Sequence, residues 1–230
     1  MQIIQVKQYI RDGKDYVSKR YLVEEGDNIY IRNVRLVSIK EKCNPAGTVS
    51  FDTIVSSMKP YGLRGDFFKN PAKYKLPAVG TEKFDNCLTI IGLNEKLQRT
   101  YRYVNKEYPL PKTEMLYKYK IFVTRNYGNG TIGEKPSSPI IAEPGTLCTE
   151  TFVQIGPFNT RKEAENCLTY MQTKLFRLLV GVRKQDQGAG KEVYHYVPIQ
   201  DFSTAVTDKQ LYEKYGLSED EINYINKLIG

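Results

Sequence analysis

The chain has 230 residues, which is enough for one large domain or two unequal lobes with a sizeable core. Its 40% apolar fraction argues against disorder, and no apolar run approaches the roughly 20 residues that a membrane span needs. Lys and Arg number 34 against 26 Asp and Glu, so the net charge of +8 favours a polyanionic partner such as nucleic acid. The N-terminus lacks a signal-peptide pattern, and we expect a cytoplasmic protein with no membrane partner.

The first 41 residues predict a β-hairpin and the start of a second β-rich or mixed segment. Apolar and polar residues alternate on both sides of RDGKD, residues 11–15, whose Asp-Gly pair suits a tight turn. Residues 28–43 continue the apolar pattern. An isolated hairpin is marginally stable, so this one needs a partner on which to pack.

Residues 51–70 predict a short helix that ends before Pro60 and then a glycine-containing loop. Lys59, Tyr61 and Arg64 supply two cations and a stacking ring in that loop. The pattern is typical either of a phosphate or base contact or of an ordinary surface turn, and both interpretations stay open.

Two strands are predicted next, on either side of a segment rich in cations and tyrosines. Residues 86–94 read as a buried strand, and residues 96–106 interleave cations with tyrosines. That interleaving is typical either of a nucleic-acid surface or of a solvated face over packed rings. Residues 119–124 form a further strand that opens into a glycine-rich loop, which lacks the residue order of a phosphate-binding P-loop. The loop carries Arg125, Asn126, Tyr127 and Asn129.

Two strands around a Glu-Pro-Gly turn at residues 143–145 lead into one long helix. Thr160 and Glu163 form a capping box that starts the helix at about Arg161. One apolar face recurs at helical spacing: Ala164, Cys167, Leu168, Met171, Leu175, Leu178, Leu179 and Val182. The opposite face and the helix end carry cations and amides: Lys174, Arg177, Arg183, Lys184, Gln185 and Gln187.

The C-terminal part predicts one strand and two short helices. His195, the only histidine, lies in the alternating stretch EVYHYVPI, where a structural role is expected. Gly216 separates the two helices, and Ser218 with Glu221 forms a second capping box. Acidic residues at the start of the last helix argue against a DNA-reading helix-turn-helix, so we expect a packing clamp.

The sequence lacks convincing catalytic motifs. It has neither the glycine-rich cofactor loop nor the acid-Pro-Pro-aromatic tetrapeptide of adenine methyltransferases. Asp52, Asp66 and Asp85 are isolated and form no convincing metal-binding nuclease set. The four cysteines are far apart, without a Cys-x-x-Cys or Cys/His pair, so reduced thiols and no metal site are expected. These observations favour a binding module.

Six segments together resemble a known family. They are FDTIVSSMKPYGLR, YKIFVTRNYGNG, PIIAEPGTLCTETFVQIGPF, TKLFRLLVGVRKQDQ, YHYVPIQDFS and TDKQLYEKYGLSEDEINYI. In this order they resemble the C-terminal target recognition region of bacterial type II adenine methylases, including fused type IIG restriction enzymes. The long helix followed by VPIQDF is also similar to the target recognition domains of type I specificity subunits.

The resemblance implies a target recognition domain over residues 42–230, with residues 1–41 as the tail of a methylase domain. S-adenosylmethionine would belong to that methylase domain, so no cofactor is expected in this chain. We expect an α+β fold, with a twisted, mainly antiparallel sheet, one long packed helix and a small helical C-terminal clamp.

The partner implied by the resemblance is double-stranded DNA, beside a methylase or restriction subunit. The residues expected to contact DNA are Lys59, Tyr61, Arg64, Arg125, Asn126, Tyr127, Asn129, Lys174, Arg177, Arg183, Lys184, Gln185 and Gln187. Arginine and lysine suit guanine edges or phosphates, and amides suit adenine. A protein-docking module and a divergent nuclease stay open as alternatives.

Overall fold

The computed structural model describes the backbone of residues 2–5, 20–25 and 28–230, and the side chains from residue 35 onward. The helices are α1 (Val34–Cys43), α2 (Arg161–Gln172), α3 (Lys174–Arg183), α4 (Asp208–Lys214) and α5 (Glu219–Leu228). Short 3-10 helices are η1 (Phe51–Ile54), η2 (Pro71–Tyr74), η3 (Glu114–Tyr117) and η4 (Lys191–Tyr194). The strands are β1 (Gln2–Gln5), β2 (Arg20–Glu25), β3 (Asn28–Asn33), β4 (Leu88–Leu93), β5 (Arg99–Val104), β6 (Tyr119–Thr124), β7 (Ile140–Ala142), β8 (Thr146–Cys148) and β9 (Phe152–Phe158).

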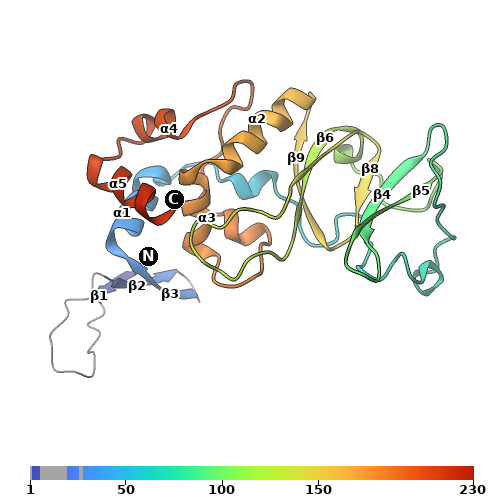
Figure 1. Cartoon of the computed structure of the whole chain (residues 1–230), viewed down its shortest axis with the longest axis horizontal. Helices are drawn as coiled ribbons and strands as arrows, with labels where there is room; N and C mark the ends of the chain where they lie inside the picture. Colours follow the sequence, from blue (N-terminus) through green and yellow to red (C-terminus); the bar gives the residue numbers. More distant parts are fainter. Residues whose placement is uncertain (1, 6–19, 26–27) are drawn as a thin grey trace.

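The strands of the described residues form three small sheets, ordered β1-β2-β3, β5-β4-β8 and β7-β6-β9. All the pairs are antiparallel except the parallel pair β4–β8. The helices gather on one side and β4, β5 and β8 on the other, with β6 and β9 between them (Figure 1). The predicted α+β class is confirmed, although the single sheet that we expected is divided.

The N-terminal hairpin prediction is confirmed for its two strands, because β1 pairs with β2 in antiparallel register. The predicted RDGKD turn lies outside the described residues. The mixed segment that follows divides into β3 and α1. The predicted domain boundary after residue 41 falls inside α1, whose Leu36 and Ile39 are fully buried in the helical core. That core therefore begins before the predicted boundary.

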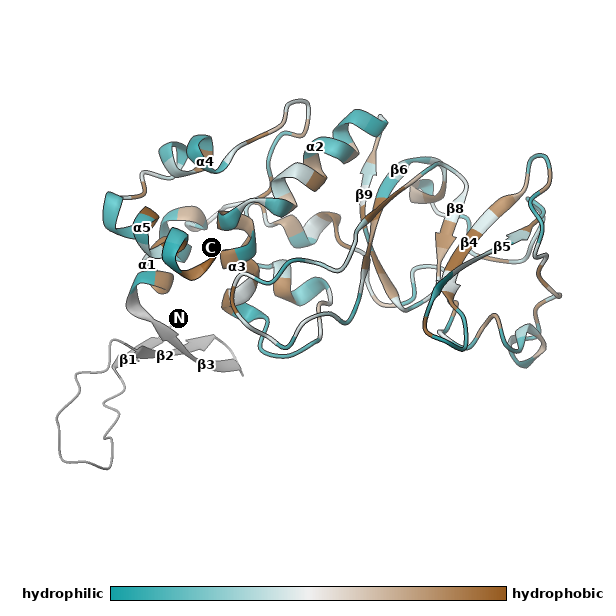
Figure 2. Cartoon of the chain, in the orientation of Figure 1, coloured by the Kyte–Doolittle hydropathy of each residue, from teal (hydrophilic) through white to brown (hydrophobic). Residues whose placement is uncertain are grey.

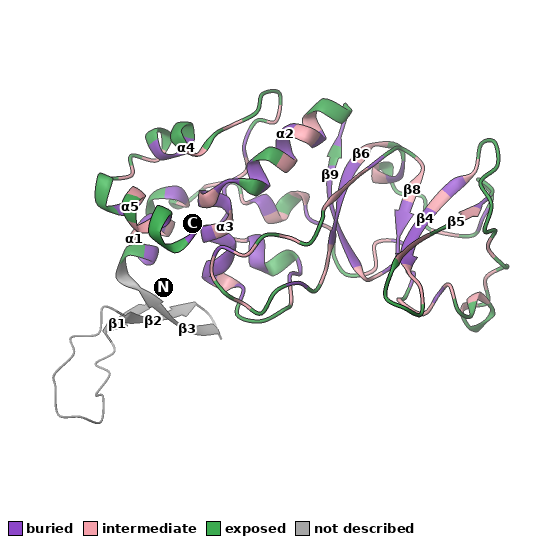
Figure 3. Ribbon diagram, in the orientation of Figure 1, coloured by how far each residue is buried: buried purple, intermediate pink, exposed green. Residues whose placement is uncertain are grey.

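Two hydrophobic cores underlie the two sides of the molecule. The helical core centres on Phe51, whose ring lies 5.1 Å from that of Phe176 in an edge-on arrangement and 5.7 Å from that of Tyr194. The second core lies under β4 and β8. Figure 2 shows hydrophobic residues along β4 and β8, and Figure 3 shows the same strands largely buried while α4 is largely exposed. Truncating a buried ring such as Phe51 typically costs about 3–5 kcal/mol.

The single long helix that we expected is wrong, because the chain breaks at Thr173 into α2 and α3. The Thr173 hydroxyl donates to the Tyr170 carbonyl and accepts from the Phe176 amide, so it offers the backbone an alternative to the helical ladder. The Asp208 carboxylate accepts from the first two amides of α3 at 2.9 and 3.0 Å. These bonds satisfy the donors that a new helix start exposes. The predicted capping box at Thr160 is confirmed.

The strand predicted around His195 is also wrong. Residues 191–194 form η4, and His195 keeps a helical backbone. Val193, Tyr194, Tyr196 and Val197 are all buried, which follows the i, i+1, i+3, i+4 pattern of a helical turn rather than a two-residue alternation. Apolar residues in this stretch fit the spacing of a strand as well as that of a helical turn, so the sequence could not distinguish the two structures.

The C-terminal clamp is confirmed as a pair of short helices. Gly216 has a φ of +57° between α4 and α5, and Ser218 with Glu221 forms the predicted capping box. Glu221 also accepts from Lys42 at 2.7 Å and from Ser38 at 2.8 Å, both on α1. The clamp is thereby tied to the first helix.

Candidate nucleic-acid interface

Three loops that are distant in the sequence meet beside the C-terminal end of α3. They comprise residues 57–65, 125–130 and 185–188, and we call their combined outer face the loop surface. Asn126 and Gly188 form an antiparallel bridge between the second and third loops. The Tyr127 amide donates to the Gln187 carbonyl at 2.9 Å, so the two loops pair through their backbones.

Gly130 lets these two loops approach closely. Its φ is +91°, which side-chain-bearing residues rarely adopt. A Cβ atom at Gly130 would lie 2.2 Å from the Gln185 carbonyl oxygen and 2.6 Å from the Asp186 amide nitrogen. The loop pairing therefore requires glycine at this position.

A buried ion pair lies under the same loops. The Lys184 ammonium, 2% exposed, is 2.5 Å from the Glu134 carboxylate and donates to the Tyr127 carbonyl at 2.9 Å. The Glu134 carboxylate also accepts from the Asn129 amide at 2.6 Å and from the Thr131 amide at 3.0 Å. Burial by itself would raise the pKa of Glu134, but the donors that face the carboxylate outweigh it and hold that pKa below its usual value. This pair joins the end of α3 to the second loop.

The first loop is fixed by the turn between β8 and β9. The Glu150 amide donates to the Leu63 carbonyl at 2.8 Å, and the Glu150 carboxylate accepts from the Gly65 amide at 3.0 Å. Lys59 lies 3.5 Å from the same carboxylate. Arg125 connects the first and second loops, because its guanidinium contacts the Met58 sulfur. All three loops thus form one continuous surface.

Seven of the thirteen predicted contact residues are exposed or half-buried members of this surface. They are Lys59, Arg64, Arg125, Asn126, Asn129, Gln185 and Gln187. Their assignment to DNA contact remains a prediction.

Three other predicted contact residues are buried, which contradicts a direct contact with DNA. Tyr61 is fully buried, Tyr127 is 6% exposed and Lys184 is 2% exposed. The Tyr61 hydroxyl donates to the Gln154 side chain at 2.8 Å, and burial raises the Tyr61 pKa well above its usual value. These side chains support the loops from below.

The remaining three lie outside the loop surface. Lys174 stands at the opposite end of α3 and donates to Asn226 of α5 at 2.9 Å. Arg177 is half-buried and donates to the Gly133 carbonyl at 2.8 Å. Arg183 stacks on the Tyr196 ring at 5.7 Å. These three contacts connect parts of the chain to one another.

The two arginines of residues 96–106 make contacts within the chain, and both interpretations of that segment stay predictions. Arg99 donates to the Ser137 and Ser138 carbonyls at 3.0 and 2.6 Å. Arg102 lies over the Phe68 ring at 5.2 Å. Both guanidinium groups are thus engaged within the chain.

Sequence reasoning missed Met58, a 53% exposed methionine between the cations of the first loop and Arg125. The excess of positive charge around this loop extends beyond Lys59 and Arg64. Residues 57–76 contain five basic side chains and a single acid, Asp66. Lys73 and Tyr74 both donate to Asp66 and lower its pKa to about 2, so its charge is already matched within the chain. A charge count over a short window would have shown this excess.

We expected Asp52 to be isolated, and this is wrong. Its carboxylate lies 3.0 Å from His195 Nδ1. The His195 side chain is 46% exposed and that of Asp52 is 19% exposed. In the part of the chain whose side chains are described, no three His, Cys, Asp or Glu residues group as a metal-binding set. Across the same part, no helix has the length and apolar character that crossing a membrane requires.

The sequence matches no protein-family model and no curated protein. Among solved structures, the chain is similar to the type IIG restriction endonuclease BpuSI, with a TM-score of 0.37 and 11% sequence identity. The similarity covers 83% of this chain and 31% of that enzyme. It is a loose likeness to a restriction-modification enzyme, and the chain spans under a third of that enzyme's length.

Proposed function

We propose that the loop surface binds double-stranded DNA and reads its sequence, as the target recognition module of a restriction-modification enzyme. In this proposal the catalytic chemistry and S-adenosylmethionine belong to a methylase or restriction partner. The chain itself positions that partner on its target.

The observation that carries the proposal is the convergence of cations and amides from three distant loops on one supported surface. Lys59, Arg64 and Arg125 supply positive charge. Cations that neutralise phosphates release counterions and provide most of the sequence-independent affinity. The exposed amides of Asn126, Gln185 and Gln187 lie on the same surface. An amide can pair with an adenine edge in the major groove, which gives the surface a means of discrimination.

The test is a salt-titrated binding assay against a random duplex pool, followed by selection and sequencing of the retained DNA. The proposal predicts duplex binding that weakens steeply with salt, together with enrichment of one short motif. Binding without enrichment would support a phosphate-binding surface and contradict sequence reading by this chain alone.

A double substitution tests whether the amides of the loop surface read the DNA sequence, independently of the positive charge of the chain. Gln185→Ala with Gln187→Ala removes two amides without changing charge, so enrichment should weaken at one or two base positions while the salt dependence stays the same. Gln172→Ala, an exposed amide on α2, is the matched control and should leave the enriched motif unchanged. Absence of duplex binding at low salt would overturn the proposal.

A further inference from the structure

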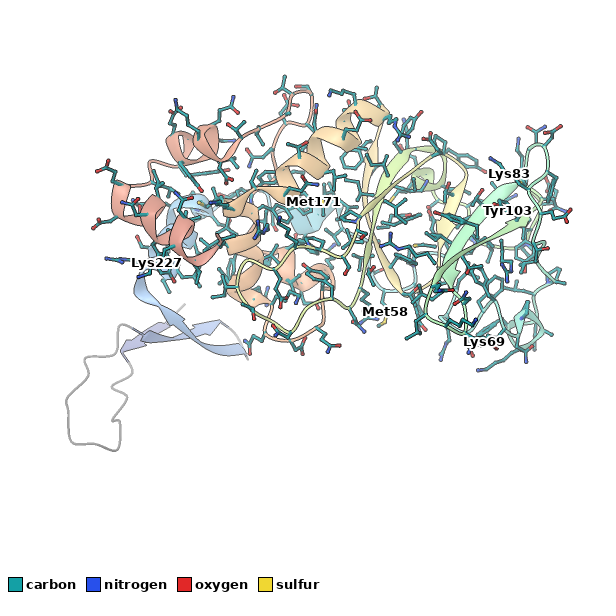
Figure 4. All side chains as sticks on the ribbon, in the orientation of Figure 1. Met58, Lys69, Lys83, Tyr103, Met171 and Lys227 are labelled. Atoms are coloured by element: carbon teal, nitrogen blue, oxygen red, sulfur yellow. The ribbon has the colours of Figure 1, made fainter. Side chains whose placement is uncertain are left out.

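Met58 is the most exposed large apolar side chain of the loop surface, with 53% of its area accessible. It lies directly before Lys59 and against the Arg125 guanidinium. Figure 4 shows Met58 on the lower edge of the molecule where the helical and strand-rich sides meet, the edge along which Lys69 also lies. An apolar side chain held in solvent among cations gains little for the fold, because its burial is incomplete.

The backbone that presents Met58 is held firmly on both sides. Before it, the Ser56 amide donates to the Gln154 carbonyl at 2.7 Å and the Ser56 hydroxyl accepts from the Gln154 amide at 3.0 Å. After it, Tyr61 is fully buried and bonds to the Gln154 side chain at 2.8 Å. Both supports converge on one residue of β9. Met58 is therefore exposed on a short, fixed segment.

The turn itself is strained next to Met58. Lys59 has a φ of +61°, in the left-handed region that a residue with a side chain rarely adopts. The Gly62 amide closes the turn on the Lys59 carbonyl at 3.0 Å. Strained, over-determined backbone of this kind clusters where a site requires a fixed geometry.

We infer that Met58 is a wedge that inserts between two neighbouring base pairs of bound duplex DNA, partly unstacks them and kinks the helix. The inference rests on the proposed function and adds the mode of binding. Apolar wedges of this type, methionine among them, recur in proteins that bend DNA. The unbranched thioether of Met58 can adapt to the gap between bases. Lys59 follows Met58 in the chain and the Arg125 guanidinium contacts the Met58 sulfur, so two cations are available beside the wedge for the adjacent phosphates. Pyrimidine–purine steps unstack most easily, so the retained DNA should carry one at the Met58 position.

The test uses the duplexes retained by the random-pool selection, with 2-aminopurine replacing each adenine in turn and a fluorophore pair at the two ends. Unstacking raises 2-aminopurine fluorescence, and kinking raises energy transfer between the ends. For the wild-type chain we expect both signals at one step. Met58→Ala should lose both and bind about tenfold more weakly. Met58→Leu keeps an apolar wedge and should retain both.

The control is Leu228→Ala, which removes an exposed apolar side chain from α5 and should change neither signal. The salt dependence of Met58→Ala should equal that of the wild type, because no cation is removed. A duplex with a mismatch at the affected step should bind Met58→Ala as well as wild type, since the mismatch removes most of the unstacking cost. Equal thermal unfolding of wild type and variant shows that the fold is intact.

Two results contradict this account in different ways. Salt-sensitive binding by the wild type without any fluorescence or energy-transfer change overturns the wedge and leaves the DNA-binding proposal standing. No binding by the wild type overturns both.

Discussion

At its N-terminal end, α3 meets the C-terminal helices through polar groups close to the surface, whereas at its C-terminal end it meets the loop surface through a buried charge. Asp208 accepts from the first amides of α3, and Lys174 donates to Asn226. At the other end the Lys184 ammonium is 2% exposed and paired with Glu134. The Lys174–Asn226 bond is exposed to water, whereas the Lys184 ammonium is shielded from it.

This difference between the two ends of α3 indicates at which end a single substitution should strongly lower the stability of the fold. A solvent-accessible carboxylate at a helix start contributes about 1 kcal/mol, because water competes for the same donors. A buried ion pair that loses one partner leaves an unpaired charge in the interior, which is far more costly. Substitutions at the loop end of α3 should therefore disturb both stability and the loop surface, and those at the clamp end neither strongly.

The largest effect is expected for Lys184→Met. The substitution leaves the Glu134 carboxylate, whose side chain is only 15% exposed, without its cation, so the free energy of unfolding should fall by about 3–5 kcal/mol. Denaturant unfolding measures it. Lys174→Met, at the clamp end of the same helix, is the matched control and should cost under about 1 kcal/mol. Equal losses in the two variants would contradict the contrast between the two ends of α3.

Gly130→Ala should come next, with a loss of about 3 kcal/mol in the free energy of unfolding. It combines a left-handed backbone with a Cβ atom 2.2 Å from the Gln185 carbonyl oxygen. Gly47→Ala is the control, since Gly47 has a φ of +87° and open space around the added atom. That variant should cost only about 1 kcal/mol. Equal losses of unfolding free energy in Gly130→Ala and Gly47→Ala would contradict the claim that the close approach of the two loops requires glycine at position 130.

Glu134→Gln tests the ion pair through pH. The folded pKa of Glu134 is lowered, so the stability it contributes is present above its unfolded pKa and disappears as pH falls through the folded value. At neutral pH the substitution should cost about 2 kcal/mol, the scale of hydrogen bonds to a buried charge. In acid the difference from wild type should shrink toward zero. A difference that stays constant from neutral to acidic pH would show that the carboxylate charge is not what Lys184 requires.

The smallest effect is expected for Asp208→Ala, about 1 kcal/mol, the usual cost of removing a side chain that caps a helix start. The variant should bind DNA as the wild type does. Asp220→Ala, an exposed acid in the first turn of α5, makes a charge-matched comparison with a loss of a few tenths of a kcal/mol. A change in DNA binding by Asp208→Ala would extend the functional surface to the clamp.

The sequence predicted correctly those features that depend on residues close to one another in the chain. The capping boxes at Thr160 and Ser218 and the strand Tyr119–Thr124 follow from neighbouring residues, and the structure confirms them. The break at Thr173 depends only in part on a local bond, the one that the Thr173 hydroxyl accepts from the Phe176 amide. The first two amides of α3 are satisfied by Asp208, more than thirty residues later in the chain, which the local sequence could not predict.

The loop surface shows the same limit. Composition identified cations in the loop at residues 57–65 and a cation with two amides in the loop at residues 125–130, and the structure brings these loops together. Which side chains face solvent depends on partners far away in sequence, as for Lys184 with Glu134. Residue type alone therefore could not separate the exposed side chains of these loops from the buried ones that support them.

The most direct test of DNA binding by the loop surface compares two variants that lose the same charge. The loop variant is Lys59→Gln, Arg64→Gln and Arg125→Gln. The helix variant is Lys162→Gln, Lys209→Gln and Lys227→Gln, on exposed positions of α2, α4 and α5. The quantity measured is the slope of log K against log salt for duplex DNA. We predict that the loop variant loses up to about 3 units of slope and the helix variant keeps the wild-type slope. Equal slopes in the two variants would contradict the claim, because the duplex would then respond to net charge and not to the loop surface.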